Sequence, residues 1–255
     1  MGINWVRLVL GASAVLAIGA AGGLIGSSAL AARAYQDRAV QDQKRRQELS
    51  VTGSARQRIK SDLGVWRVRA YGRGRDLKTA YQNLKETCDR VQKFLDTRQF
   101  KQAEIALSAV DTTTHYMKDK DGRETREVAE YSLDREFTVT SAQLPTVTSA
   151  AAEVTELLQE GLHVVSMAPA YYYTRMAELK MEALGEASKN ARLRAELIAC
   201  NSGCRVGEVR QASVGVLQIT RPHSTDVSSS GIYDTTTVGK DVNAVVHLTF
   251  TIQSP

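Results

Sequence analysis

The segment Val242-Asn-Ala-Val-Val-His-Leu-Thr-Phe-Thr-Ile252 decides the fold class of this chain. Every second residue from Val242 to Ile252 is apolar, which is the period of a strand that buries one face. Further back, Leu49-Ser-Val-Thr-Gly-Ser-Ala55 shows a similar alternation, and residues 65–70 form another strand-like run. The folded part of the chain is therefore predicted to begin and end with sheet-forming segments.

Three helices are predicted between these strands. Asp76 is well placed to cap a helix over residues 77–97, in which apolar residues recur at three- and four-residue steps. A second helix is predicted to begin near Pro145 and to stop at Gly161, and a third spans residues 175–201. The inward stripe of the third is predicted to be Met176, Leu179, Ala183, Leu184, Ala187, Ala191, Ala195 and Ile198.

Shorter strands complete the pattern. We expect them at residues 105–109, 128–140, 163–168 and 206–220, with Asp121-Gly122 as a hairpin turn and a Ser/Thr-rich loop over residues 221–237. The order is then β-β-α-β-β-α-β-α-β-β, which indicates an α+β fold of antiparallel strands with helices on one face. The repeated strand–helix–strand theme also predicts two interlocked subdomains.

The amino-terminal segment has a different character. Residues 8–32 contain no charged side chain, and about 20 such residues are enough to cross a bilayer as a helix. The alternative is a cleaved secretory signal, for which Ala29-Leu30-Ala31 offers a small-x-small site. We expect an uncleaved transmembrane signal-anchor at 1–34, a charged stalk at 35–48 and an α+β domain at 49–255.

Glycines in the apolar segment are spaced for helix association. Gly19 and Gly23 are four residues apart, as are Gly22 and Gly26, so they share one face of a helix. Such a face permits close helix–helix packing in lipid. The alternative is that small residues simply dominate this segment.

The charge of the chain argues against one class of function and also bears on the orientation of the apolar segment in a membrane. The net charge is +5, and acidic and basic residues are interleaved, which is unlike the one-sided basic stripe of a nucleic-acid-binding protein. Five basic residues follow the apolar segment within residues 33–46, and the positive-inside rule would keep them in the cytoplasm. We therefore expect no nucleic-acid partner, and charge alone favours a cytoplasmic domain.

Three cysteines are present, which argues against a complete disulfide framework. Cys200 and Cys204 flank a predicted helix end and a glycine turn, and thiols at this spacing can bridge in an oxidising compartment. Two free thiols are the alternative. Zinc would need two more ligands, and the four histidines show no ligand spacing. Cys88 is predicted to lie in the core.

No catalytic constellation, metal site or cofactor motif is found. Tyr71-Gly-Arg-Gly-Arg75 lacks the third glycine of a dinucleotide fingerprint and is interpreted as a turn between strand and helix. Tyr171-Tyr-Tyr173 is interpreted as core or edge-strand packing, with a groove or an oligomer seam as the alternative. The sequence predicts neither catalytic residues nor a cofactor.

Four stretches resemble parts of the SIMPL-domain family of bacterial proteins. Leu49-Ser-Val-Thr-Gly-Ser-Ala55 resembles its opening strand, Ala187-Ser-Lys-Asn-Ala-Arg-Leu-Arg-Ala-Glu-Leu-Ile-Ala199 its alanine-rich helix, and Gly203 to Val209 its glycine turn. Residues 239–252 resemble the closing strand. The resemblance implies a periplasmic or membrane-anchored protein, a tendency to form ring-like homo-oligomers and an association with oxidative-stress tolerance. It implies no catalytic residues.

The expected function is that of a non-enzymatic protein of the inner membrane, single-pass, with its domain in the periplasm. Its expected partners are copies of itself and the lipid bilayer, and the final strand, residues 242–252, is expected to pair across subunits. The alternatives are a thiol-based redox enzyme using Cys200 and Cys204, or a small-ligand-binding periplasmic protein. Redox catalysts usually place two residues between their cysteines, whereas this pair has three.

Overall fold

A computed structural model describes residues 47–253 of the chain. The predicted signal-anchor, with Gly19, Gly22, Gly23 and Gly26, and nearly all of the stalk lie outside the described residues. Among residues 47–253, no helix combines the length and the apolar character needed to span a membrane.

The order of the elements confirms the α+β interpretation. Along residues 47–253 they are β1 (Glu48–Lys60), β2 (Leu63–Gly74), α2 (Leu77–Thr97), η1 (Gln102–Glu104), β3 (Ile105–Leu107), β4 (Asp111–Lys118), β5 (Glu124–Ser141), α3 (Leu144–Glu153), η2 (Val154–Glu160), β6 (His163–Ser166), β7 (Ala170–Tyr172), α4 (Met176–Asn201), β8 (Arg205–Val214), β9 (Gln218–Thr220), β10 (Ile232–Tyr233) and β11 (Gly239–Gln253). The predicted 128–140 strand is longer than expected, and the predicted 206–220 strand is divided into β8 and β9. Strands β4, β7 and β10 were not predicted as separate strands.

The described residues divide into two compact units. One comprises residues 47–53, 191–213 and 247–253, and the other comprises residues 54–190 and 214–246. Strands β1 and β11 and helix α4 each supply residues to both units.

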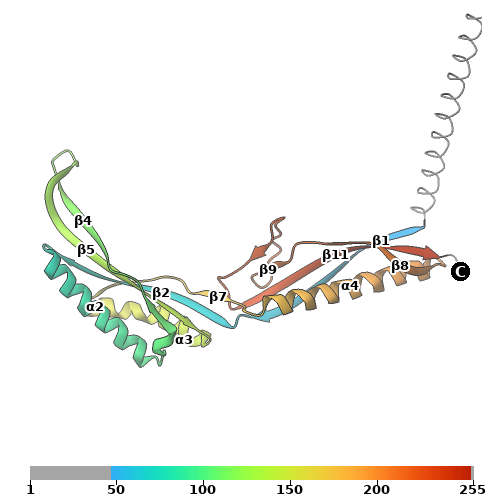
Figure 1. Ribbon diagram of the computed structural model, residues 1–255, viewed down its shortest axis with the longest axis horizontal. Coiled ribbons are helices and arrows are strands. Elements are labelled where there is room, and N and C mark those ends of the chain that lie inside the picture. Colours follow the sequence, from blue (N-terminus) through green and yellow to red (C-terminus); the bar gives the residue numbers. More distant parts are fainter. Residues whose placement is uncertain (1–46, 254–255) are drawn as a thin grey trace, which may run out of the picture. The chain divides into compact units, whose positions relative to one another are not determined.

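A six-stranded sheet forms the core of the larger unit. Its order is β3-β5-β2-β6, with β4 also paired to β5 and β7 to β2, and the long β2–β5 pair is antiparallel. Helices α2 and α3 cover one face of it (Figure 1). Trp66 and Phe137 from the sheet pack there with Leu84 and Val91 of α2 in a continuous buried cluster. Asp76 caps α2 as predicted, because its Oδ1 accepts a hydrogen bond from the Thr79 amide at 2.9 Å.

The glycines of Tyr71-Gly-Arg-Gly-Arg75 lie within β2, so the interpretation of this motif as a turn was wrong. A Cβ added at Gly72 would overlap the Leu84 nitrogen and the Ala80 carbonyl oxygen, and one added at Gly74 would lie 2.5 Å from the Ala80 nitrogen. The backbone of α2 therefore packs directly against the strand. Glycine is required at these positions for close approach rather than for a chain reversal.

A second sheet has the order β1-β11-β9-β10, with β8 also paired to β11. Helix α4 runs beside this sheet in Figure 1. Its buried side chains recur every four residues, and all but the first are alanine: Leu179, Ala183, Ala187, Ala191, Ala195 and Ala199. A stripe of alanines allows a helix to lie close to a sheet.

Two expectations about this part of the chain were wrong. Ile198 is exposed, and Ala199 takes its place in the buried stripe of α4. Strand β11 has β1 on one side and β8 and β9 on the other, so it offers no free edge along these pairs for another subunit. The expectation that the final strand pairs across subunits is therefore not compatible with its place in the sheet.

Candidate binding groove

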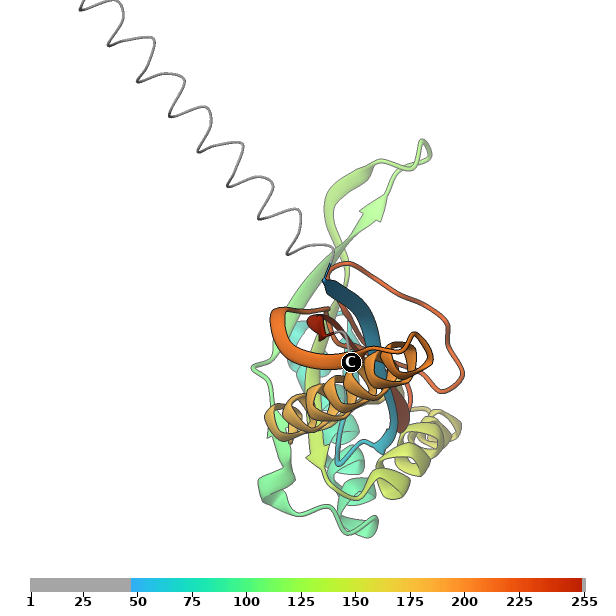
Figure 2. The same ribbon diagram turned by 90° about the vertical axis from the view of Figure 1, so that its right-hand side faces the viewer.

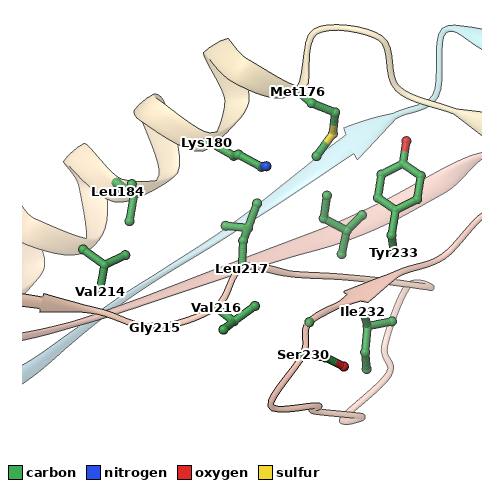
Figure 3. Close-up of a pocket in the computed structure, with 12 residues that line it drawn as sticks. Met176, Lys180, Leu184, Val214, Gly215, Val216, Leu217, Ser230, Ile232 and Tyr233 are labelled. Atoms are coloured by element: carbon green, nitrogen blue, oxygen red, sulfur yellow. The ribbon is translucent and has the colours of Figure 1, made fainter.

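An apolar groove of about 420 Å³ lies between the first half of α4 and the segment that joins β8 to β10 (Figure 3). Drug-sized ligands bind in pockets of about 300–1,000 Å³. The residues that line the groove are Met176, Lys180, Leu184, Val214, Gly215, Val216, Leu217, Ile219, Ser230, Gly231, Ile232 and Tyr233. All twelve belong to the larger unit.

One wall of the groove is a row of side chains on α4. Met176, Lys180 and Leu184 follow one another at four-residue steps, so they lie one above the other on the same helix face. This row is next to the buried stripe that begins with Leu179 and Ala183, and its apolar members are only partly exposed. Met176 and Leu184 were predicted to face inward, and they instead border the groove.

The opposite wall is held in place by a buried glutamine. Gln218 Nε2 donates to the Ser228 carbonyl oxygen at 2.8 Å, and Gln218 Oε1 accepts from the Ser228 amide at 3.3 Å. These bonds fix the loop that carries Ser230 and Gly231 against the segment of Val216. Gly231 has a φ of 87°, and a Cβ there would lie 2.8 Å from Val216 Cγ1.

Strand β10 closes the end of the groove, where Tyr233 is held by its neighbours. The Tyr233 ring lies 6.4 Å from that of Tyr172, and Tyr233 Oη accepts a hydrogen bond from the Tyr173 amide at 3.2 Å. Tyr171 is buried and its hydroxyl lies 2.7 Å from Thr148 Oγ1. The structure thus confirms edge-strand packing for the tyrosine cluster, with β7 as the strand.

A buried lysine and a partly buried aspartate fix the loop behind β10. The Lys240 side chain is fully buried, and its Nζ donates to the Thr237 carbonyl oxygen at 2.7 Å and lies 3.2 Å from Asp234 Oδ2. Burial raises the pKa of Asp234, but hydrogen bonds from Thr237, Thr236 and Lys240 outweigh it and hold this pKa well below its usual range. Burial lowers the pKa of Lys240.

Asp241 fixes the backbone at His223 in a similar way. Arg58 Nε and Arg56 Nη2 donate to its carboxylate at 2.9 and 2.7 Å, and the His223 amide donates at 3.0 Å. The hydrogen bonds from Arg58 and Arg56 hold the pKa of Asp241 well below its usual range. His223 has a φ of 65°, a strained conformation for a residue other than glycine, and its bond to Asp241 helps to keep it there.

The chemistry of the groove is that of binding. Its lining contributes one formal charge, Lys180, and two hydroxyl groups, from Ser230 and Tyr233; the rest is apolar side chain or backbone. Over residues 47–253, no three His, Cys, Asp or Glu side chains are grouped so as to hold a metal ion. The site can take up an apolar body and pair with an anion.

Cys200 and Cys204 line one shallow depression of about 380 Å³ with Glu196 and Arg205. Cys200 is exposed near the end of α4, Cys204 is half-buried after the glycine turn, and both are free thiols in the structure. The disulfide stays a prediction. Cys88 packs against the core as expected, and burial raises the pKa of its thiol.

A hairpin arm, residues 111–130, extends from the six-stranded sheet. It consists of β4 and residues 124–130 of β5, and none of its residues is buried. Figure 1 and Figure 2 both show it leaving the part of the sheet that the helices cover. Tyr116, Met117 and Val128 are exposed on it by 42, 50 and 39%. The arm thus presents large apolar side chains to solvent.

Neither the groove nor the arm was predicted from the sequence as a site. One signal could have pointed to the groove. The residues four positions before and after Lys180 are Met176 and Leu184, rather than the acidic residues that would pair with a lysine on a helix surface. The arm carried the hairpin signal Asp121-Gly122, and Gly122 does adopt a left-handed φ of 81°. The exposure of its apolar side chains could not be foreseen from composition.

The model of the SIMPL family, described as a protein of unknown function (DUF541), matches residues 49–250. No curated protein matches the chain.

Proposed function

This chain belongs to the SIMPL family, whose function is unknown, and we propose that it is a non-catalytic, membrane-anchored protein that assembles with copies of itself. In this proposal residues 8–32 anchor the chain in the inner membrane and the domain lies in the periplasm. The hairpin arm supplies the contact between subunits. The resemblance to bacterial relatives further suggests a role in envelope or oxidative stress.

The single observation that carries the assembly proposal is the exposed arm. An isolated two-stranded ribbon is marginally stable in water, because ordering each residue costs roughly 1–2 kcal/mol and little apolar surface is buried in return. Tyr116 and Val128 are Cα partners across this ribbon, and both are exposed. Contact with another copy would bury them and order the arm.

The edge of the arm supports the same contact. Strand β4 pairs with β5 alone among the strands of residues 47–253. An unpaired strand edge is a ready template for another strand unless it is protected. Charged residues gather at the tip, from Lys118 to Arg123, while Asp111 to Met117 carry mainly Thr, His, Tyr and Met. The edge is therefore open along most of its length.

The experiment that tests this proposal shortens the arm. His115 and Glu130 are Cα partners, so replacing residues 116–129 by Asn-Gly closes the hairpin with a two-residue turn. We expect the full chain in mild detergent to be a multi-subunit particle by light scattering, and the shortened chain to be smaller. The double substitution Tyr116→Ser and Val128→Ser should also reduce the particle size. The control substitution Thr112→Ser should leave it unchanged.

Two results would contradict the proposal. The first is a monodisperse monomer for the unmodified full chain. The second is a particle whose mass is unaffected by the shortened arm while circular dichroism shows that the fold is retained. Orientation is tested separately by a reporter fused after Pro255, and reporter activity confined to the cytoplasm would refute the periplasmic placement.

A further inference from the structure

Lys180 differs from the other basic residues on the exposed side of α4, because each of those has a partner. Arg194 Nη1 donates to the Thr52 carbonyl oxygen at 3.1 Å. Lys189 Nζ lies 2.7 Å from Glu186, and Arg192 Nε lies 2.9 Å from Glu196. Lys180 makes no ion pair with any residue between 47 and 253. Its ammonium group is therefore available for an external anion.

The position of Lys180 determines what kind of anion it would meet. Met176 and Leu184 occupy the helix positions one turn before and after it, and Leu217 faces it from the opposite wall (Figure 3). A small, fully hydrated anion would gain little from such surroundings. An anion that carries an apolar chain would gain both the charge pair and the burial of its chain.

We propose that the groove binds a single-chain amphipathic carboxylate, such as a medium-chain fatty acid. The carboxylate pairs with Lys180, and the chain lies along Leu217, Val216 and Ile232. The charge complementarity comes from Lys180, the one charged side chain in the lining, and the volume of about 420 Å³ is in the range of small-ligand sites. This ligand is independent of the assembly proposed above.

Contacts within the protein hold two parts of the groove in place, as expected for a preformed binding site. The Gln218–Ser228 pair holds one wall, and the stacked Tyr172 and Tyr233 rings hold the end. Exposed apolar side chains, Val214 and Val216 among them, remain uncovered by any described residue. A bound alkyl chain would cover this surface without a rearrangement of the walls, so little binding energy is lost to ordering.

The test uses decanoic acid that carries a photoreactive diazirine near its methyl end. The full chain is held in phosphatidylcholine nanodiscs, the probe is kept below its micelle concentration, and labelled peptides are mapped by mass spectrometry. We expect labels within residues 214–217 and 230–233. Unlabelled carboxylates should compete, with about a fourfold gain in affinity for each added methylene from hexanoate to decanoate.

Matched variants isolate the charge. Lys180→Met keeps the length and the helix propensity of the side chain and should weaken labelling about tenfold. Lys180→Glu should abolish it. Lys189→Met, on the same helix at a lysine that already has a partner, should label like the unmodified chain. Circular dichroism checks that each variant is folded.

Several outcomes would overturn the proposal. Labels elsewhere on the chain would place the ligand outside the groove. Equal labelling of the Lys180→Met and Lys189→Met variants, or equal competition by decanol and decanoate, would show that the charge is not recognised. Labels in the groove that appear only after the particle is dissociated would show that a second copy covers it. Particle mass is measured in parallel, so failure here is distinct from failure of the assembly proposal.

Discussion

Gly72 of β2 lies directly under the backbone of Leu84 in α2, with no room for a Cβ between them. Thr87 adds to this contact, because its Oγ1 donates to the Tyr71 carbonyl oxygen at 3.1 Å. The close approach brings the buried face of α2 onto Val68 and Ala70. A helix that had to move away from the strand would lose this packing along its length.

Gly72→Ala is therefore expected to lower the free energy of unfolding by about 3 kcal/mol, at the upper end of overpacking effects, because the atoms that clash are backbone and cannot rotate away. Urea unfolding followed by circular dichroism measures the change. Gly185→Ala is the matched control: nothing lies within 4 Å of a Cβ at that helical position, so we expect a gain of about 0.5–1 kcal/mol. The packing argument would be contradicted if Gly72→Ala lowered the free energy of unfolding by no more than Gly185→Ala changes it.

Lys240→Met tests the buried lysine behind β10. Removing the ammonium group leaves the Thr237 carbonyl oxygen without this donor and the Asp234 carboxylate without its cationic partner. Breaking a buried pair in this way costs about 3 kcal/mol. Lys189→Met, which removes an exposed lysine, should leave the urea midpoint unchanged. A Lys240→Met protein as stable as the unmodified chain would show that the lysine is dispensable for the fold.

Stability is also expected to depend on pH on the acid side. The pKa values of Asp241 and Asp234 are lower in the folded chain than the ordinary value of 3.8 that they take when unfolded. The ionised carboxylates thus stabilise the fold above about pH 4, and this stabilisation is lost as pH falls further and they take up protons. Asp241→Asn should flatten the acid limb of the stability curve, whereas Asp226→Asn, at an exposed carboxylate, should not. An unchanged acid limb in Asp241→Asn would refute this.

The parts of the fold that could be predicted are those with strong local signals. Helix α2 was predicted from Asp76 to its last residue, because a capping side chain and a regular apolar stripe agree there. Strand β11 was predicted in the same way from its alternation. In both elements, the spacing of the apolar residues along the sequence indicates which side is buried.

The parts that were missed depend on residues far apart in the chain. Gly72 looks like a turn glycine until α2 is placed on it. The groove is built from residues 176–184, 214–219 and 230–233, which only the folded chain brings together. Strand β4 has no buried residue, so it shows none of the apolar alternation by which strands are recognised.

Cys200 and Cys204 are expected to be bridged in protein taken from the periplasm. Both line the same depression, and an oxidising compartment removes one hydrogen from each thiol to form the bond. Mass spectrometry of non-reduced peptides should show the corresponding loss of two hydrogens. Alkylation of both thiols in freshly isolated protein would exclude the bridge, and Cys88, which packs against the core, serves as the internal control for a thiol that stays reduced.

The last prediction concerns the anchor, which we expect to strengthen the contact made by the hairpin arm. Tethering in a bilayer raises the effective concentration of a weak contact, and small residues at Gly19, Gly22, Gly23 and Gly26 would let anchor helices pack closely. Replacing Gly22 and Gly23 with isoleucine should reduce the particle mass measured by light scattering and leave the unfolding of the domain unchanged. Ala17 and Ala21 would lie on the opposite side of such a helix, so replacing them with isoleucine is the matched control. Equal particle masses for both pairs would show that the glycine face makes no contact and that assembly rests on the domain alone.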